Sequence, residues 1–220
     1  MPTDSVIASP RRNRVDPFGD LNAVSARGMF TGNRGCVVDD HERVVRHHGS
    51  QLWIVCLTRY RDWRWPLARP RRWTPLFFLD DAVALAAGHR PCGLCRRHDY
   101  LGYRDAVTRA LGAATPLRAG ELDARLRAER LARGRGLTRG QDRKLWQAAL
   151  ESLPDGTVIV DDEHQCCLVQ GASLRPFAFS GWGAPRSRPP ALAVSVLTPP
   201  TSVAALAAGY RPTLHASAVA

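Results

Sequence analysis

The chain has almost no lysine and no long apolar run. Lys144 is the only lysine among 31 basic residues, so the positive charge is carried by arginine. The longest apolar run, Ala191 to Leu197, contains Ser195 and is far shorter than the roughly 20 residues that a membrane-spanning helix needs. The segment from Met1 to Arg14 has no apolar stretch, which predicts no signal peptide. We therefore expect a cytoplasmic protein without a membrane partner.

Common catalytic motifs are also missing. The sequence contains no G-x-S-x-G nucleophile elbow, no phosphate-binding glycine loop and no H-E-x-x-H helix. An acidic run, Asp39-Asp40-His41, has the residue types of a nuclease or glycosylase site, although such a run is more often a turn. Whether the protein is an enzyme is therefore left open.

The composition indicates a folded protein with a polyanionic partner. Hydrophobic residues make up 45% and charged residues 23% of the chain, which excludes disordered and collagen-like classes. The formal net charge of +11 favours nucleic acid as the partner. We expect DNA rather than RNA. A GC-rich genome, which favours arginine codons, is the alternative explanation of the arginine excess.

Short strands alternating with short helices predict an α+β fold. Leu52 to Thr58 is typical of a buried strand. Asp80 is placed to cap a helix from Ala82 to Ala87, and Gly88 follows where a left-handed residue ends a helix. A second helix is predicted from Asp99 to Leu111 by its stripe of apolar residues.

The C-terminal half is predicted to contain two more helices and a hairpin before a final strand and helix. One helix is expected from Glu121 to Arg133, and a capping box, Thr138 with Gln141, predicts another that ends near Ser152. The hairpin is expected over Thr157 to Val160 and Cys166 to Val169. We divide the chain into a flexible basic tail (1–20), a zinc-binding domain (21–111) and a C-terminal α+β subdomain (121–220).

A short internal repeat links the two parts. Leu85-Ala-Ala-Gly-His-Arg-Pro91 recurs as Leu206-Ala-Ala-Gly-Tyr-Arg-Pro212. Glycine can end a helix and proline prevents it from restarting, so the repeat predicts the same strand–helix–turn used twice.

The strongest chemical motif is Cys92-Gly-Leu-Cys95. Two cysteines at this spacing can turn both thiolates toward one tetrahedral metal ion. The turn after Pro91 also frees backbone N–H groups to hydrogen-bond the sulfurs. The sequence therefore predicts a zinc site with Cys92 and Cys95 as ligands.

The stretch from Leu76 to Arg97, which includes FFLDDAVALAAGHRPCGLCRR, resembles the second half of the Ada-type zinc-binding domain. The resemblance implies that Cys92 and Cys95 supply two of four zinc ligands. In that family the other two come from a Cys-x-x-x-Cys about thirty residues earlier, which this sequence lacks. The fragments GNRG, Trp-Ile-x-Cys and LTPP also resemble an uncharacterised actinobacterial family, which implies no function.

The remaining ligands are therefore sought elsewhere in the chain. We favour Cys36 and Cys56, which would complete an all-cysteine site. Cys166 and Cys167 lie in the predicted hairpin, one facing inward and one outward, and are interpreted as structural. Three histidines are the alternative ligands: His41, His47 and His48.

A basic, aromatic segment from Arg59 to Trp73 interleaves arginines with tryptophans. Arginines bind phosphates and tryptophans stack on bases, so the segment predicts nucleic-acid binding with a strong salt dependence. The alternative is an edge strand with core tryptophans and solvated arginines. The predicted contact residues are Arg59, Arg61, Trp63, Arg64, Trp65, Arg71, Arg72 and, from the cysteine turn, Arg90.

Three functions follow from these features. The first is a zinc-containing nucleic-acid-binding protein, in DNA repair or regulation. The second is a DNA-acting enzyme; the Ada resemblance implies alkyl transfer to a zinc-bound cysteine, although the position that normally carries this chemistry is missing. The third is an adaptor for protein partners, in which zinc is only a structural staple.

Overall fold

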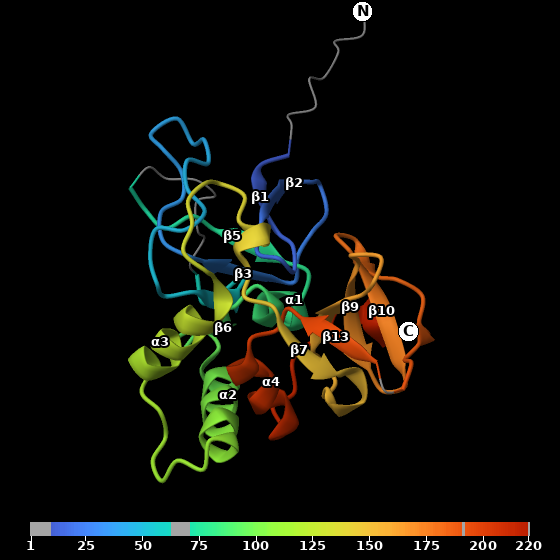
Figure 1. The fold of residues 1–220 in the computed structure, drawn as a ribbon. Helices are drawn as coiled ribbons and strands as arrows, with labels where there is room; N and C mark the ends of the chain where they lie inside the picture. Colours follow the sequence, from blue (N-terminus) through green and yellow to red (C-terminus); the bar gives the residue numbers. More distant parts are fainter. Residues whose placement is uncertain (1–9, 63–70, 191, 220) are drawn as a thin grey trace, which may run out of the picture.

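The computed structural model describes residues 10–62, 71–190 and 192–219, which form a mixed α+β structure. Figure 1 shows sheet strands β1, β2, β3 and β5 on one side, β9, β10 and β13 on another, and α1 between them. The α+β prediction is confirmed. Three of the predicted nucleic-acid contacts, Trp63, Arg64 and Trp65, lie outside the described residues.

The first sheet is built from the N-terminal part of the chain. Its six strands lie in the order β2-β1-β5-β3-β4-β6. β1 comes from the expected flexible tail, where Asn13 and Val15 are buried and therefore fix this segment in the sheet. The strands are β1 (Arg12–Val15), β2 (Leu21–Ala23), β3 (Phe30–Asn33), β4 (Ile54–Leu57), β5 (Leu76–Phe78) and β6 (Arg90–Pro91).

The second sheet is built from the C-terminal part. Its main path is β11-β10-β9-β8-β13-β7, and β12 pairs with β10. The predicted hairpin is confirmed, since β8 and β9 pair antiparallel. The strands are β7 (Trp146–Ala149), β8 (Val158–Val160), β9 (Cys166–Gln170), β10 (Ser173–Ala178), β11 (Gly181–Trp182), β12 (Arg186–Ser187) and β13 (Ala193–Val196).

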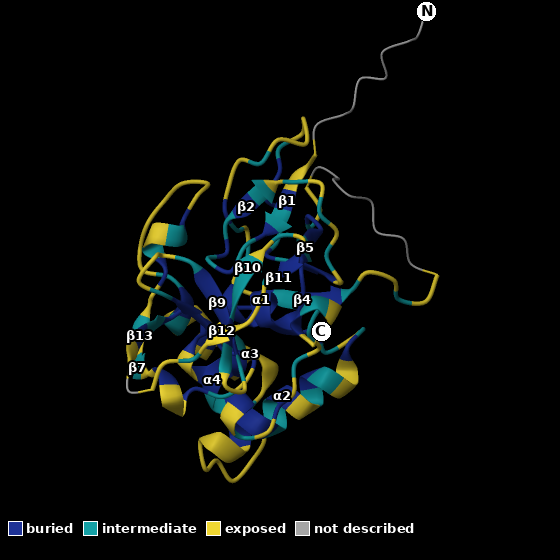
Figure 2. Ribbon diagram, turned by 90° about the vertical axis from the view of Figure 1, so that its right-hand side faces the viewer, coloured by how far each residue is buried: buried dark blue, intermediate teal, exposed yellow. Residues whose placement is uncertain are grey.

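Four α-helices occur among the described residues. The predicted cap of the first is confirmed: the Asp80 side chain accepts a hydrogen bond from Val83 N at 3.1 Å, and Gly88 follows with φ +85°. Figure 2 shows α1 buried, whereas α2 alternates buried and exposed turns. The helices are α1 (Asp81–Ala86), α2 (Arg97–Ala110), α3 (Ala119–Arg130) and α4 (Pro200–Ala207).

The helix predicted from Thr138 to Ser152 is wrong. The structure has short 3-10 turns at Gly140–Asp142 and Leu150–Ser152, with β7 between them. The backbone N–H groups of Arg139 and Gly140 donate to the Asp20 carboxylate at 2.6 and 3.0 Å, so a distant side chain replaces the local capping box. Alternating burial along β7 then suits a strand paired with β13.

The internal repeat has the same helix end in both copies, although Arg90–Pro91 then forms β6 and Arg211-Pro212 is in no strand. α1 and α4 each end at a glycine in the left-handed region, Gly88 with φ +85° and Gly209 with φ +97°. Among the described helices, none has the length and apolar character needed to cross a membrane.

The hydrophobic core connects the two sheets. One buried cluster contains Leu76 and Phe78 of the first sheet together with Val158 and Leu168 of the second. A second cluster packs α2 against α4, where the Tyr103 hydroxyl lies 2.9 Å from Ser202 Oγ. The N-terminal and C-terminal parts of the chain therefore share one hydrophobic core.

Candidate metal centre and basic surface

Three cysteines from separate parts of the chain converge at one end of the first sheet. The sulfur atoms of Cys56, Cys92 and Cys95 all lie within 4.8 Å of one another. Cys56 and Cys92 are buried and Cys95 is partly exposed. Among the described residues, no other group of three or more His, Cys, Asp or Glu side chains is close enough to hold a metal ion.

Parallel strand pairing brings these cysteines together. β4 pairs with β6 so that Ile54 faces Arg90 and Val55 faces Pro91. Cys92 continues this pairing, since its backbone N–H donates to Val55 O at 2.9 Å. Cys56 is the next residue of β4, so it and Cys92 are neighbours across the two strands. The Cys-x-x-Cys turn then returns Cys95 to the same point before α2 begins.

The three thiols hydrogen-bond one another and the surrounding backbone. The pKa of Cys92 is lowered because the side chains of Cys56 and Cys95 donate to its sulfur, and the same contact raises the pKa of Cys56. The Leu94 backbone N–H also donates to Cys92 Sγ, at 3.4 Å, as the turn predicted. This set of donors favours a thiolate at Cys92, which is the form that binds metal.

A small cavity of about 150 Å³ opens over the three cysteines. Its walls are mainly apolar and include Ile54 and Leu94. Tyr60 and Trp73 also line it. These two residues lie near the beginning and at the end of the basic, aromatic segment, so that segment starts and finishes beside the thiols.

The other predicted ligands lie apart from the three-cysteine cluster. Cys36 donates instead to Val38 O at 3.3 Å. His41 is exposed, and His47 and His48 contact each other at 3.2 Å between their Nδ1 atoms. The expected fourth sulfur ligand is therefore not brought to the site.

Cys166 and Cys167 are both buried, in different hydrophobic clusters. The alternation predicted along the strand is present, but the second sheet is covered on both faces, so the residue expected to face outward is also enclosed. Burial raises the pKa of both thiols, that of Cys167 to about 12. Both are inert packing residues at neutral pH.

The described arginines of the basic, aromatic segment are on the surface. Arg59, Arg61, Arg71 and Arg72 are all exposed. Arg90 is different, because it is 4% exposed and donates to both carboxylate oxygens of Asp123 at 2.8 Å. Arg90 is thus an internal ion-pair partner rather than a surface phosphate contact.

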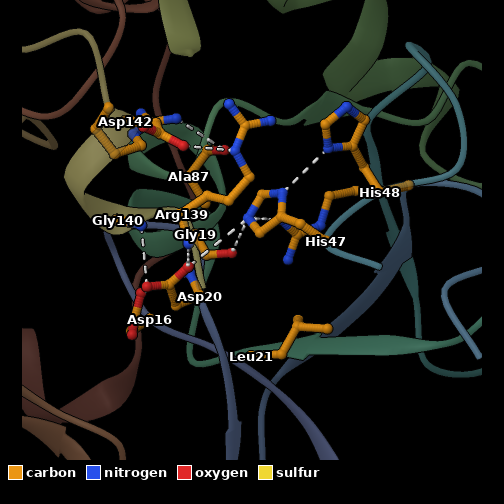
Figure 3. Close-up of polar contacts among 12 residues, drawn as sticks. Asp16, Gly19, Asp20, Leu21, His47, His48, Ala87, Arg139, Gly140 and Asp142 are labelled. Carbon is orange, nitrogen blue, oxygen red and sulfur yellow. Dashed lines mark hydrogen bonds and ion pairs between the residues drawn. The ribbon is translucent and has the colours of Figure 1, made fainter. Parts of the chain in front are cut away.

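A second arginine-rich region escaped the sequence analysis. Five arginines occur from position 130 to position 143, where the sequence predicts the end of one helix at Arg133, an interruption at Gly134 and Gly136, and the start of another helix at Thr138. Figure 3 shows Arg139 and Asp142 of this stretch near His47 and Asp20. The run R-G-R-G-L-T-R-G was the available signal, since its three glycines disfavour a helix and its three arginines concentrate positive charge in a loop.

Comparison with protein-family models, curated proteins and solved structures found no match for this chain. The site must therefore be interpreted from its own geometry.

Proposed function

We propose that this chain is a zinc-containing nucleic-acid-binding protein. Cys56, Cys92 and Cys95 hold the ion, and the segment from Arg59 to Trp73 contacts the nucleic acid. The observation that carries the proposal is the meeting of three thiols beneath a cavity lined by Tyr60 and Trp73. A metal bound there would brace the segment where it leaves β4 and where it returns.

Zinc suits this ligand set. Thiolates are soft donors that select zinc, Cu(I) or iron–sulfur clusters, and zinc is four-coordinate. Residues 63–70 contain no Cys, His, Asp or Glu, so this stretch cannot supply a protein ligand of those types. The fourth position then faces the cavity, where a water molecule or another small ligand completes the tetrahedron.

The surface charge supports nucleic acid as the partner. Four exposed arginines flank the ends of the segment, and arginine forks pair with phosphate oxygens through two hydrogen bonds. Arg61 also lies 5.2 Å from the Tyr60 ring centroid, which presents a cation and a flat ring together. This combination is typical of single-stranded nucleic-acid binding.

Zinc binding is tested by native mass spectrometry. We expect one zinc per chain in the wild type and its loss in Cys92→Ser, because two thiolates and a hydroxyl hold zinc poorly. Cys36→Ser is the matched control and should keep the ion, since Cys36 lies apart from the cluster. A folded wild type that binds no zinc would refute the metal site.

Nucleic-acid binding is tested by a salt series on single- and double-stranded oligonucleotides. Replacing Arg61 or Arg72 by Gln should lower the slope of log affinity against log salt by about one unit, because each releases one counterion fewer. Replacing Trp63 or Trp65 by Ala should weaken binding by about 1–3 kcal/mol with little change in that slope. Absence of binding at low salt would favour the adaptor function instead.

A further inference from the structure

A cavity of about 290 Å³ lies between α3, the segment after it, and the loop that precedes β4. Its lining includes none of the three clustered cysteines and none of the described residues of the segment Arg59 to Trp73. None of its lining residues is acidic. The lining side chains with positive or potentially positive charge are Arg127, Arg130, Arg133, Arg139 and His48.

These arginines are only partly neutralised by the protein. Arg139 is paired with Asp142 at 2.7 Å. Arg130 is 3% exposed, and its guanidinium donates to the Gly88 and Gln51 carbonyl oxygens rather than to a carboxylate. Arg127 donates to Gln51 Oε1 at 2.7 Å. The cavity therefore has a surplus of cationic donors around it.

The buried region beside the cavity adds to this positive field. Trp53, which lines the cavity, has the guanidinium of Arg130 at 3.9 Å and that of Arg34 at 4.7 Å from its ring. Arg34 is fully buried, and among the described residues its Nε and Nη2 atoms have no hydrogen-bond partner. Arg143, which is also buried, donates only to main-chain carbonyl oxygens of Ala87, Ala86 and Leu197.

The nearest interior carboxylates offset this charge only in part: Asp16 and Asp20 raise the pKa of Arg34 and Arg143 but form no ion pair with them among the described residues. Asp20 accepts from the Arg139 and Gly140 backbone, with His47 at 3.9 Å (Figure 3). Asp16 accepts from Asn22 and from Asp20 N, and burial raises its pKa, which disfavours its charged form. Within the described part of the chain, neither carboxylate lies within 4 Å of Arg34, Arg130 or Arg143 nitrogens.

Burial of like charges leaves the guanidinium groups in an unfavourable state. The pKa values of Arg34 and Arg130 are lowered to about 9, mainly by loss of solvent and further by the charge of Arg143. The opposing attraction of nearby carboxylates, Asp16 and Asp20 for Arg34 and Asp123 for Arg130, offsets only part of this shift. An anion in the adjoining cavity would offset this repulsion and stabilise the charged forms. Buried charges in proteins are ordinarily paired, so an anion in the cavity would supply a partner that the chain provides only in part.

We propose that this cavity binds a phosphate monoester. Arg127, Arg130 and Arg133 are the anion-binding groups, and His48 and Arg139 complete the wall. Several guanidinium groups around one space suit a dianion with three terminal oxygens better than a carboxylate, because each fork can bind two oxygens. The volume lies near the lower limit of ligand pockets, roughly 300–1,000 Å³, so the bound group is compact.

Isothermal titration of the zinc-loaded full chain tests the site. Inorganic phosphate and AMP should bind, whereas adenosine should not, because the phosphate supplies the contacts. Arg127→Gln and Arg133→Gln should each weaken AMP binding about tenfold, the loss expected for one charge-assisted hydrogen bond. Both side chains are exposed enough that their loss leaves the fold intact.

The matched control is Arg125→Gln, which removes an exposed arginine of α3 outside the cavity. It should bind AMP as the wild type does. An equal loss in this variant would mean general charge attraction and would overturn the proposal, as would wild-type protein that binds neither phosphate nor AMP at millimolar concentration.

Two oligonucleotides separate the possible sources of the phosphate. A short strand with a 5′-phosphate that competes with AMP, while the 5′-hydroxyl form does not, identifies a nucleic-acid terminus as the ligand. AMP binding without competition from the 5′-phosphorylated strand identifies a free phosphorylated small molecule. Either result supports the site, and competition by both strands alike would refute a monoester-specific pocket.

Discussion

Arginine has two different roles in this protein at the scale of the residue. The sequence analysis assigned the arginine excess to a nucleic-acid surface, yet several of these side chains are inside the fold. Arg96, for example, donates to the buried Asp81 carboxylate at 2.5 and 2.8 Å and also pairs with Asp99. The charges of Arg90 and Arg96 are therefore structural, because interior carboxylates pair with them. The buried arginines are Arg34, Arg90, Arg96, Arg130, Arg139 and Arg143.

His47, which is buried, and His48, which is half-buried, make stability depend on pH. Burial and the charge of Arg34 lower the pKa of His47 to about 2 and that of His48 to about 4. An unfolded histidine titrates near 6.5, so below that pH the unfolded chain binds more protons and the free energy of unfolding falls. The contribution of His47 to this fall in the free energy of unfolding should approach about 1.4 kcal/mol per pH unit as the pH drops toward 5.

Urea unfolding of wild type and His47→Gln between pH 7 and pH 5 measures this contribution. The difference in free energy of unfolding between the two proteins should shrink as the pH falls, because only the wild type carries the penalty of a neutral imidazole at position 47. His98→Gln, which removes a fully exposed histidine, is the control. The prediction would be contradicted if wild type and His47→Gln differed in free energy of unfolding by the same amount at every pH in this range.

At the scale of the element, local signals were reliable where tertiary contacts agreed with them. The cap at Asp80, the glycine after α1 and the hairpin of β8 and β9 were all predicted correctly. The helix expected after Thr138 failed because the Asp20 carboxylate takes the N–H groups of Arg139 and Gly140. A residue more than a hundred positions away thus decided that segment.

The repeated helix ends offer a matched pair of substitutions. Gly88 and Gly209 both have positive φ, so alanine at either should cost about 1–2 kcal/mol of backbone strain. A Cβ at Gly209 meets nothing within 4 Å, whereas one at Gly88 comes to 3.0 Å from the Arg130 side chain. Gly88→Ala should therefore destabilise more than Gly209→Ala.

Chemical denaturation of both variants measures this difference. The decrease in free energy of unfolding that both variants share reports the strain of the left-handed backbone. The additional decrease in Gly88→Ala reports the crowding against Arg130. Equal free energies of unfolding would show that Arg130 moves aside without cost.

At the scale of the whole molecule, the two sheets depend on one another. Leu168 of β9 is fully buried in the cluster that also holds Phe78 and α1, and α2 packs on α4 through Tyr103 and Ser202. The division into a zinc-binding domain and a C-terminal subdomain remains a prediction, but this shared core indicates that neither part is stable alone.

Splitting the chain in the connector between α2 and α3 tests that dependence. Fragments 1–115 and 116–220 should each lack cooperative unfolding, because each exposes half of the shared core. In the intact chain, Leu168→Ala should lower stability by about 2–5 kcal/mol while circular dichroism still reports one transition. A fragment that unfolds cooperatively by itself would establish independent domains.

The sequence by itself determined the structural features that depend only on residues close together in the chain. The α+β class, the capped helix before Gly88 and the Cys-x-x-Cys turn with its N–H donor to sulfur are consequences of local spacing and backbone geometry. Tertiary structure decided which distant groups meet. Parallel pairing of β4 with β6 places Cys56, and not Cys36, beside the Cys-x-x-Cys turn. Packing of the chain buries Arg90. It also brings three other arginines to one cavity: Arg127, Arg130 and Arg133. Such contacts join residues far apart in the chain, and their energies depend on desolvation and charge that arise only when the fold excludes water.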